Sequence, residues 1–120
     1  MTHNDIHDLF GAIDAQDTPK FLSYLSPDVR FQFGNWPAAI GKDATAEAVD
    51  GFFGTIVALS HDLHNIFLVE DHAIARGEVT YTRKDSTQVT LPFTNVYGIN
   101  DGKIHDYQIY MDINPLYTQG

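Results

Sequence analysis

Two stretches near the end of the chain alternate between apolar and polar residues: Val89-Thr-Leu-Pro-Phe-Thr-Asn-Val-Tyr-Gly-Ile99 and Lys103-Ile-His-Asp-Tyr-Gln-Ile-Tyr-Met-Asp-Ile113. Successive side chains of a strand point to opposite faces, so this period predicts two strands that each bury one face. The connecting Asn100-Asp101-Gly102 is typical of a tight hairpin turn, because these residues tolerate left-handed backbone. The pair indicates a curved sheet that closes over a pocket.

The first half of the chain predicts three helices and one strand. Apolar residues recur at helical spacing from Ile6 to Ile13. Thr18-Pro19 is typical of a helix start, with the threonine hydroxyl as the cap, and Ser26-Pro27-Asp28 is expected to end that helix. A third helix is expected from Ala44 to Leu59. Residues 29–33 alternate and therefore predict a half-buried strand.

Further strands are expected at 62–70 and 73–84, so the helices come first and most strands follow. This order predicts an α+β fold, in which three N-terminal helices pack on one side of a strongly curved, mostly antiparallel sheet that forms a cone with an internal pocket. The chain has 120 residues, of which 43% are apolar. That length suits one core, so we expect a single domain over residues 1–120.

The composition argues against several classes of partner. The chain carries 7 basic and 16 acidic residues, for a net charge of -9, which opposes binding to nucleic acid or to an anionic membrane. It has no cysteine, so a thiolate metal site or a cysteine nucleophile is excluded. No signal-peptide pattern or membrane-spanning run is present, and we expect a cytoplasmic protein.

Three short passages carry a resemblance to a known family. They are Leu25-Ser-Pro-Asp-Val-Arg-Phe31, Gly41-Lys-Asp-Ala44, and Asp101-Gly-Lys-Ile104 followed by Tyr107 and Tyr110-Met-Asp112. In this order they resemble the nuclear-transport-factor-2-like superfamily, and within it the SnoaL-like and ketosteroid-isomerase-like proteins. The resemblance implies a cone with a deep apolar cavity. It also implies an isomerase, cyclase, epoxide hydrolase, dehydratase or non-catalytic binding protein, and often a homodimer.

The catalytic residues of two branches of that superfamily do not carry over well. The positions that resemble the tyrosine and two aspartates of ketosteroid isomerases are Leu9, Phe33 and Thr94. Arg76-Gly-Glu78 could match the Arg-x-acid pair of limonene-epoxide-hydrolase-like enzymes, but their other three polar positions look like Phe31, Phe33 and Ile109. Neither known constellation is therefore expected to operate here.

Arg76 and Glu78 are the best acid and base candidates by pattern. They lie two apart on an expected strand and so share a face, where the guanidinium could tune the carboxylate for proton transfer. The catalytic interpretation of this pair requires Glu78 to point into the pocket as the base and Arg76 to adjust its pKa. The alternative is an exposed charge pair beside Thr80 and Thr82.

Histidines supply further candidates. His61 and His64 are three apart, so a straight strand sends them to opposite faces and prevents them from sharing a metal ion. His64 is a candidate base or donor in the cavity, because histidine exchanges protons near neutral pH; the alternative is a structural histidine. His3 and His7 have helical metal-pair spacing but no third ligand, and we assign them no role.

Other polar and aromatic residues are candidate substrate contacts. Asn95 lies among aromatic neighbours on its own face and needs a partner, which a ligand carbonyl could supply. Trp36 could close the pocket mouth or anchor a loop. Asp112 ends the last strand, where a cavity role competes with a turn role before Asn114-Pro115. The full candidate set is Asn95, Tyr107, Trp36, Phe33, Ile109 and Asp112.

These patterns lead to three hypotheses. The first is a SnoaL-like enzyme that transfers protons on a hydrophobic cyclic or polyketide-like molecule, with Glu78, Arg76 and His64 as catalytic residues. The second is a non-catalytic carrier of a small hydrophobic ligand, and the third is a dimeric interaction module. No cofactor motif or metal site is expected, because phosphate loops, nucleophile elbows and metalloprotease patterns do not occur.

Overall fold

The computed structural model describes residues 1–118, so 119–120 of the expected domain lie outside the described residues. The helices are α1 (His3–Asp14), α2 (Thr18–Leu22), α3 (Lys42–Phe53) and α4 (Asn114–Tyr117). The strands are β1 (Leu25–Phe33), β2 (Ala39–Ile40), β3 (Ala58–Val69), β4 (His72–Thr82), β5 (Gln88–Asn100) and β6 (Lys103–Tyr110). No helix among these residues is long and apolar enough to cross a membrane.

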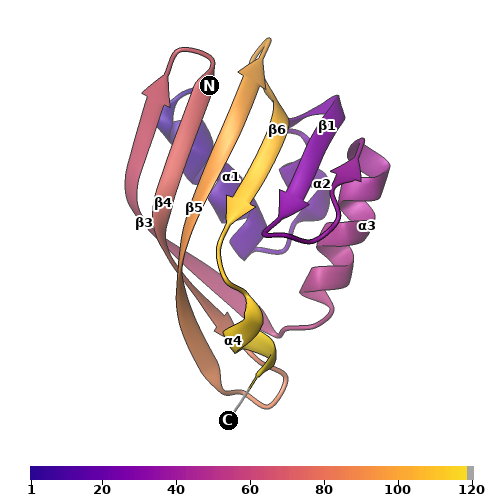
Figure 1. Ribbon diagram of the computed structural model, residues 1–120, viewed down its shortest axis with the longest axis vertical. Helices are drawn as coiled ribbons and strands as arrows, with labels where there is room; N and C mark the ends of the chain where they lie inside the picture. The colour runs from indigo at the N-terminus through magenta and orange to yellow at the C-terminus, as the bar shows by residue number, and fades with distance from the viewer. Residues whose placement is uncertain (119–120) are drawn as a thin grey trace.

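All strands belong to one six-stranded sheet in the order β2-β1-β6-β5-β4-β3. β1 pairs with β6 in parallel, and the other neighbouring pairs are antiparallel. Figure 1 shows that the sheet is curved and that α1, α2 and α3 lie on one side of it. The α+β class and the mostly antiparallel sheet predicted from the sequence are confirmed.

The β5–β6 hairpin forms at the predicted turn. Asp101 and Gly102 have φ angles of 52° and 72°, and two successive positive values are the signature of the turn that matches the twist of a hairpin. The register of this hairpin places Asn95 opposite Ile109 and Tyr97 opposite Tyr107. A register shift between Gly98 and Ile99 lies between the turn and these pairs, so the turn and the bulge together set which residues of β5 and β6 face each other.

The second helix is shorter than predicted, and its cap is a different residue. It ends at Leu22, and β1 already begins at Leu25. Asp17 is the N-cap, and its carboxylate accepts from the backbone N–H of Lys20 at 3.2 Å. The Thr18 hydroxyl instead donates to Asp50 of α3 at 2.5 Å. The Thr18 hydroxyl, which was expected to cap the helix, therefore makes a tertiary contact instead.

The third helix also ends early, at Phe53 instead of Leu59. Gly54 is its C-cap, and the backbone N–H of Val57 donates to the carbonyl of Thr82 at 2.9 Å. The segment after Gly54 is therefore already joined to β4 and continues into β3. Leu59, which was expected on the helix, lies on that strand as a buried residue.

The first helix fixes one wall of the core. Thr2 and Asp5 form a reciprocal capping box, with bonds of 3.1 Å and 2.8 Å that satisfy free amides at the helix start. The apolar face of α1 is buried against the concave side of the sheet through Ile6, Leu9, Phe10 and Ala12. This packing carries Asp14, the last residue of α1, to the edge of β3.

Candidate functional site

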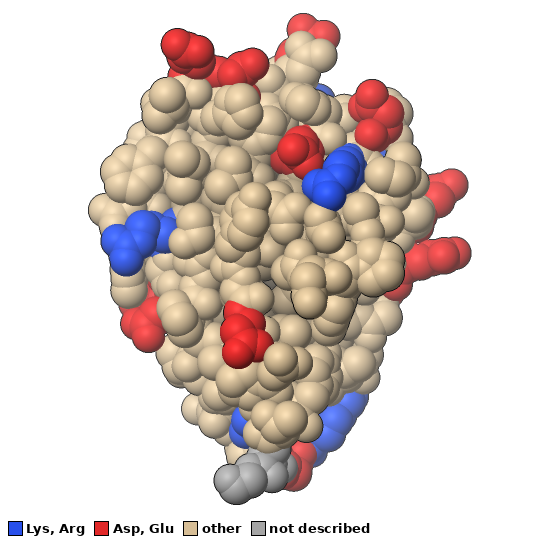
Figure 2. All heavy atoms as spheres, viewed as in Figure 1, with Lys and Arg blue, Asp and Glu red and all other residues tan. Residues whose placement is uncertain are grey.

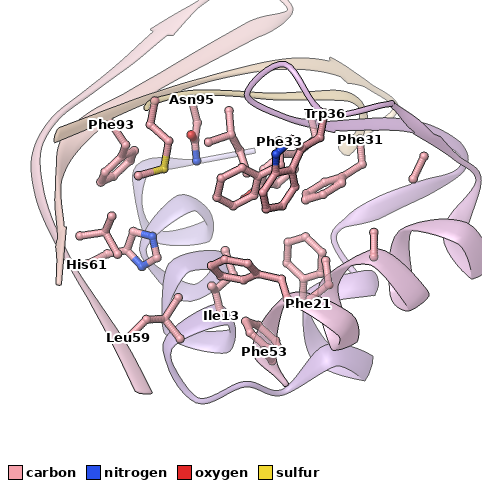
Figure 3. A pocket seen from close by; sticks show the side chains of 18 of the residues that line it. Ile13, Phe21, Phe31, Phe33, Trp36, Phe53, Leu59, His61, Phe93 and Asn95 are labelled. Atoms are coloured by element: carbon pink, nitrogen blue, oxygen red, sulfur yellow. The ribbon is translucent and has the colours of Figure 1, made fainter. Parts of the chain in front are cut away.

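A cavity of about 90 Å³ lies between the concave face of the sheet and the helices. Figure 3 shows its labelled side chains converging on this space from the strands on one side and from the helices on the other. The lining is mainly aromatic, through Phe21, Phe31, Phe33, Trp36, Phe52, Phe53, Tyr81, Phe93 and Tyr107. A pocket with few polar groups and aromatic walls suits a hydrophobic molecule.

His61 and Asp14 form a pair at one wall of the cavity. The ring Nδ1 of His61 lies 2.6 Å from Asp14 Oδ1, and the backbone N–H of His61 donates to Asp14 Oδ2 at 2.9 Å. The side chains are 10% and 28% exposed. Because a carboxylate accepts only, Nδ1 carries a proton, so in the neutral ring the lone pair is on the second nitrogen, Nε2.

Aromatic packing holds the imidazole of His61 in place. Its ring lies 4.8 Å from that of Phe10 and 5.2 Å from that of Phe93, the latter edge to face. The ring lines the cavity, as Figure 3 shows. An imidazole anchored at one nitrogen and packed on both sides has little freedom to turn, so Nε2 is presented to the cavity in one orientation.

A second polar group sits on β5 and β6. Asn95 lines the cavity and is 3% exposed, and its Nδ2 donates to the Tyr97 hydroxyl at 3.0 Å. The Tyr97 hydroxyl donates in turn to that of Tyr107 at 3.5 Å. Burial raises the pKa of both tyrosine hydroxyls, so both stay protonated at neutral pH.

Trp36 marks the mouth of the cavity. Its indole stacks on Phe33 with ring centroids 5.0 Å apart and an angle of 24° between the planes. The residue is 38% exposed, so one side of the indole lines the cavity while the other meets solvent. The Gln32 amide donates to the Trp36 carbonyl at 2.9 Å and ties this loop to β1.

The structure brings most of the expected substrate contacts together. Five of the six line the cavity: Asn95, Tyr107, Trp36, Phe33 and Ile109. Asp112 does not belong to the lining. It is exposed, and its carboxylate accepts from the backbone N–H of Asn114 at 3.0 Å, which is the turn role left open by the sequence.

The expectation that Glu78 and Arg76 face the cavity is wrong. Along β4 the buried positions include Ala75, Val79 and Tyr81, so the residues between them point to the outer face. The Glu78 side chain is 49% exposed, and Arg76 donates to Asn65 at 3.0 Å on that outer face. This outward placement removes the basis for Glu78 as the base.

His64 also lies outside the cavity. Alternation along β3 from Leu59 and His61 places it on the outer face, and the β3–β4 register shifts beside it, between Leu63 and Asn65. His64 Nε2 lies 3.4 Å from Asp62 and 3.6 Å from Glu78, all three exposed. Their possible metal-ligating atoms lie within 4.8 Å of one another, an arrangement that exposed acidic groups commonly adopt without an ion.

His61 and His64 do lie on opposite sides of the sheet, as their spacing predicted, but the inward histidine is His61. The pattern Leu59-x-His61-x-Leu63 places a polar residue in phase with apolar ones, which was a usable signal. Its partner Asp14 lies 47 residues earlier, at the end of a helix, and no local pattern connects the two.

The curved sheet and the three helices on one side of it define a nuclear-transport-factor-2-like fold. Residues 6–107 match the family model of the SnoaL-like domain, and the chain belongs to this family. No curated protein matches the chain.

Solved structures agree with the fold. A nuclear-transport-factor-2-like protein of unknown function from Burkholderia pseudomallei K96243 aligns with a TM-score of 0.85 at 19% identity, covering 97% of this chain and 95% of that one. A candidate SnoaL-like polyketide cyclase from Jannaschia sp. CCS1 gives 0.82 at 17% identity, covering 94% and 86%. TerC, co-crystallised with polyporic acid, gives 0.82 at 18% identity, covering 93% and 92%.

Proposed function

We propose that this chain is an enzyme that transfers a proton on a small, hydrophobic, ring-containing molecule, with His61 as the base and Asp14 as the residue that positions it. The observation that carries the proposal is the His61–Asp14 pair at the wall of an apolar cavity. Among the residues that line the cavity, His61 is the side chain best suited to take up a proton near neutral pH.

The chemistry follows from the two ring nitrogens. Asp14 accepts from Nδ1–H and keeps the lone pair on Nε2, which can remove a proton from a carbon next to a carbonyl group. The electron pair of the C–H bond moves to the carbonyl oxygen and gives an enolate. Where a C=C bond is conjugated with the enolate, return of the proton from Nε2 to the far carbon of that system shifts the double bond and completes an isomerisation. Attack of the enolate carbon on a second carbonyl carbon in the same molecule instead forms a new ring, and the resulting alkoxide takes the proton back from Nε2.

The developing oxyanion needs a donor, and Tyr107 is the candidate on the cavity wall. The raised pKa of its hydroxyl keeps the proton available for donation at neutral pH. The surrounding aromatic side chains exclude water, which strengthens such a hydrogen bond. This supports a role for Tyr107 as donor to the substrate oxygen.

The size of the cavity limits the substrate. A dry cavity of about 150 Å³ accommodates benzene. The 90 Å³ found here is smaller, so a molecule of one ring needs slight expansion, and a molecule of several fused rings needs the Trp36 loop to move. The proposal therefore favours single-ring compounds over large polycyclic ones.

Deuterium exchange tests the proposal without knowledge of the natural substrate. Cyclohexanone, cyclohexane-1,3-dione and 2-tetralone are incubated with the protein in D₂O, and exchange next to the carbonyl is followed by NMR. We expect exchange above the buffer rate for at least one single-ring probe. His61→Gln should lower the accelerated rate by about 10²- to 10⁴-fold, the usual contribution of a general base.

His64→Gln is the matched control, because it makes the same chemical change on the same strand but on the outer face. It should leave the exchange rate unchanged. If the exchange rate falls equally in both variants, or if His61→Gln exchanges at the wild-type rate, His61 is not the base.

A carrier function is the second candidate, and the first strand supports it. Phe31 and Phe33 occupy inward positions of β1 that resemble polar catalytic positions in other branches of the superfamily. A carrier would bind the ring probes without accelerating exchange. Binding measured by ligand-observed NMR together with exchange at the buffer rate would favour this function.

We also propose a homodimer through the outer face of the sheet. The face in Figure 2 has a broad area without charged side chains. The strands β3 and β6 carry exposed apolar residues, which are Phe67, Val69 and Tyr110. Light scattering after size-exclusion chromatography tests this. A dimer that Tyr110→Lys converts to a monomer would support the proposal, and a monomeric wild-type protein would contradict it.

A further inference from the structure

Asn95 carries a polar atom that the protein leaves without a partner. Its side-chain oxygen, Oδ1, is buried and has no hydrogen-bond partner among residues 1–118. Asn95 lines the cavity, and Figure 3 shows its amide group directed toward the enclosed space. Burying an amide oxygen without a donor is costly, so native proteins rarely leave one in this state.

The neighbouring hydrogen bonds explain which end of the amide is free. Nδ2 donates to the Tyr97 hydroxyl, which itself donates to Tyr107. One of the two Nδ2 hydrogens and the hydroxyl proton of Tyr97 are committed inside the wall. One end of this chain of hydrogen bonds is an acceptor, Oδ1 of Asn95. The other end is a donor, the hydroxyl of Tyr107.

The residues beside Asn95 offer no donor. Its register partners are Ala75 on β4 and Ile109 on β6. Both side chains are apolar and lack a hydrogen that oxygen accepts strongly. The donor for Oδ1 must come from the contents of the cavity.

We infer that the cavity binds a ring compound bearing a phenolic or enolic hydroxyl, which donates its hydrogen bond to Asn95 Oδ1. The inference rests on the proposed function, in that both place the ligand in this cavity, and it adds the group by which that ligand is recognised. It adds to the expected pairing of Asn95 with a ligand carbonyl, which the second Nδ2 hydrogen can serve, because the atom left without any partner is an acceptor.

Charge and shape favour a neutral hydroxyl over an ammonium group. No aspartate or glutamate belongs to the residues that line the cavity, so a cation would enter an apolar site without a counter-ion. The aromatic walls suit a flat ring, which packs against them edge to face or offset. A hydroxyl on a ring satisfies Oδ1 without bringing a charge.

The test compares phenol, toluene and anisole binding to the wild-type protein by ligand-observed NMR titration. Phenol and toluene match in size but only phenol donates, while anisole retains the oxygen and lacks the donor. We expect phenol to bind at least about tenfold more tightly than toluene or anisole, because these two leave a buried acceptor unpaired. Equal binding of phenol and toluene, or tighter binding of anisole, would overturn the inference.

Asn95→Leu supplies a second test, provided that the variant unfolds in a cooperative thermal transition. It should bind toluene at least as tightly as phenol, and a preserved phenol preference would contradict the role of Asn95.

The same titrations on His61→Gln separate the two proposals. A phenol preference that persists in His61→Gln supports the hydroxyl site even where deuterium exchange fails, and loss of the preference there would contradict a site built on Asn95.

Discussion

The carboxylate of Asp14 binds His61 at two points, the ring and the backbone. Oδ1 lies 2.6 Å from the ring Nδ1, and Oδ2 accepts from the backbone N–H at 2.9 Å. One carboxylate thus joins the end of α1 to β3 and sets the direction of the imidazole. The same contact serves the fold and the proposed chemistry, which makes it the most informative pair to change.

Asp14→Asn is expected to impair proton transfer with a limited loss of stability. An amide can donate to Nδ1 and so favour the tautomer with the proton on Nε2, which cannot act as a base. We expect the deuterium exchange rate to fall by about 10²-fold or more, as for other base-positioning carboxylates. ¹⁵N NMR of the His61 ring measures the tautomer directly, and an unchanged tautomer with full exchange would contradict the assignment.

Glu78→Gln is the matched control for that variant, since it makes the same carboxylate-to-amide change on the outer face. It should retain the wild-type exchange rate and the wild-type His61 spectrum.

Trp36→Ala is expected to widen the mouth of the cavity. Loss of the indole removes its stacking on Phe33 and one wall of the cavity, while the residue's 38% exposure limits the cost in stability. We expect weaker binding of phenol, by several-fold, and stronger binding of 2-naphthol, which has two rings. NMR titration measures both affinities, and Trp36→Phe should lie between wild type and Trp36→Ala. Parallel losses for both ligands would show that Trp36 shapes the site without limiting its size.

Gly77→Ala is expected to destabilise the fold, because the strands meet closely at the β3 bulge. A Cβ at Gly77 would lie 2.0 Å from the carbonyl oxygen of Asp62, a backbone atom that cannot move aside freely. We expect the free energy of unfolding to fall by about 1–3 kcal/mol or more, as for other overpacked sites. Urea denaturation measures the change.

Gly11→Ala is the control for that substitution, because a Cβ there meets nothing within 4 Å on the exposed side of α1. It should stabilise the protein by about 0.5–1 kcal/mol through helix propensity. A neutral Gly77→Ala would mean that the bulge can relax.

The buried tyrosines predict a loss of stability at alkaline pH. Burial raises the pKa of Tyr81, Tyr97 and Tyr107 above the ordinary value of 10.0. Above pH 10 the unfolded chain releases these protons while the folded chain keeps them, so the free energy of unfolding falls as pH rises. Urea midpoints between pH 8 and 11 measure this slope. Tyr107→Phe removes one of the three groups and should make the slope shallower, and an unchanged slope would contradict its burial.

The local patterns of the sequence were sufficient for the architecture. Alternation in 89–113, the Asp101-Gly102 turn and the helical spacing from Ile6 to Ile13 each depend on neighbours in the chain. The structure confirms the turn, the helix and the two strands, although the second strand, β6, ends at Tyr110 and not at Ile113. The same alternation placed Asn95 and Tyr107 on the inner face. These features were predictable because backbone geometry links a residue to those two, three or four positions away.

Tertiary structure decided the chemistry of the cavity. The meeting of Asp14 with His61 depends on how α1 packs against β3, and the outward direction of Glu78 depends on which face of β4 the helices cover. Both are relations between distant segments, and both are settled by packing. The sequence by itself determined a curved sheet with an apolar inner face, and only the folded chain placed His61 rather than Glu78 at that face, because the packing of the helices on one side of the sheet decides which set of alternating residues is buried.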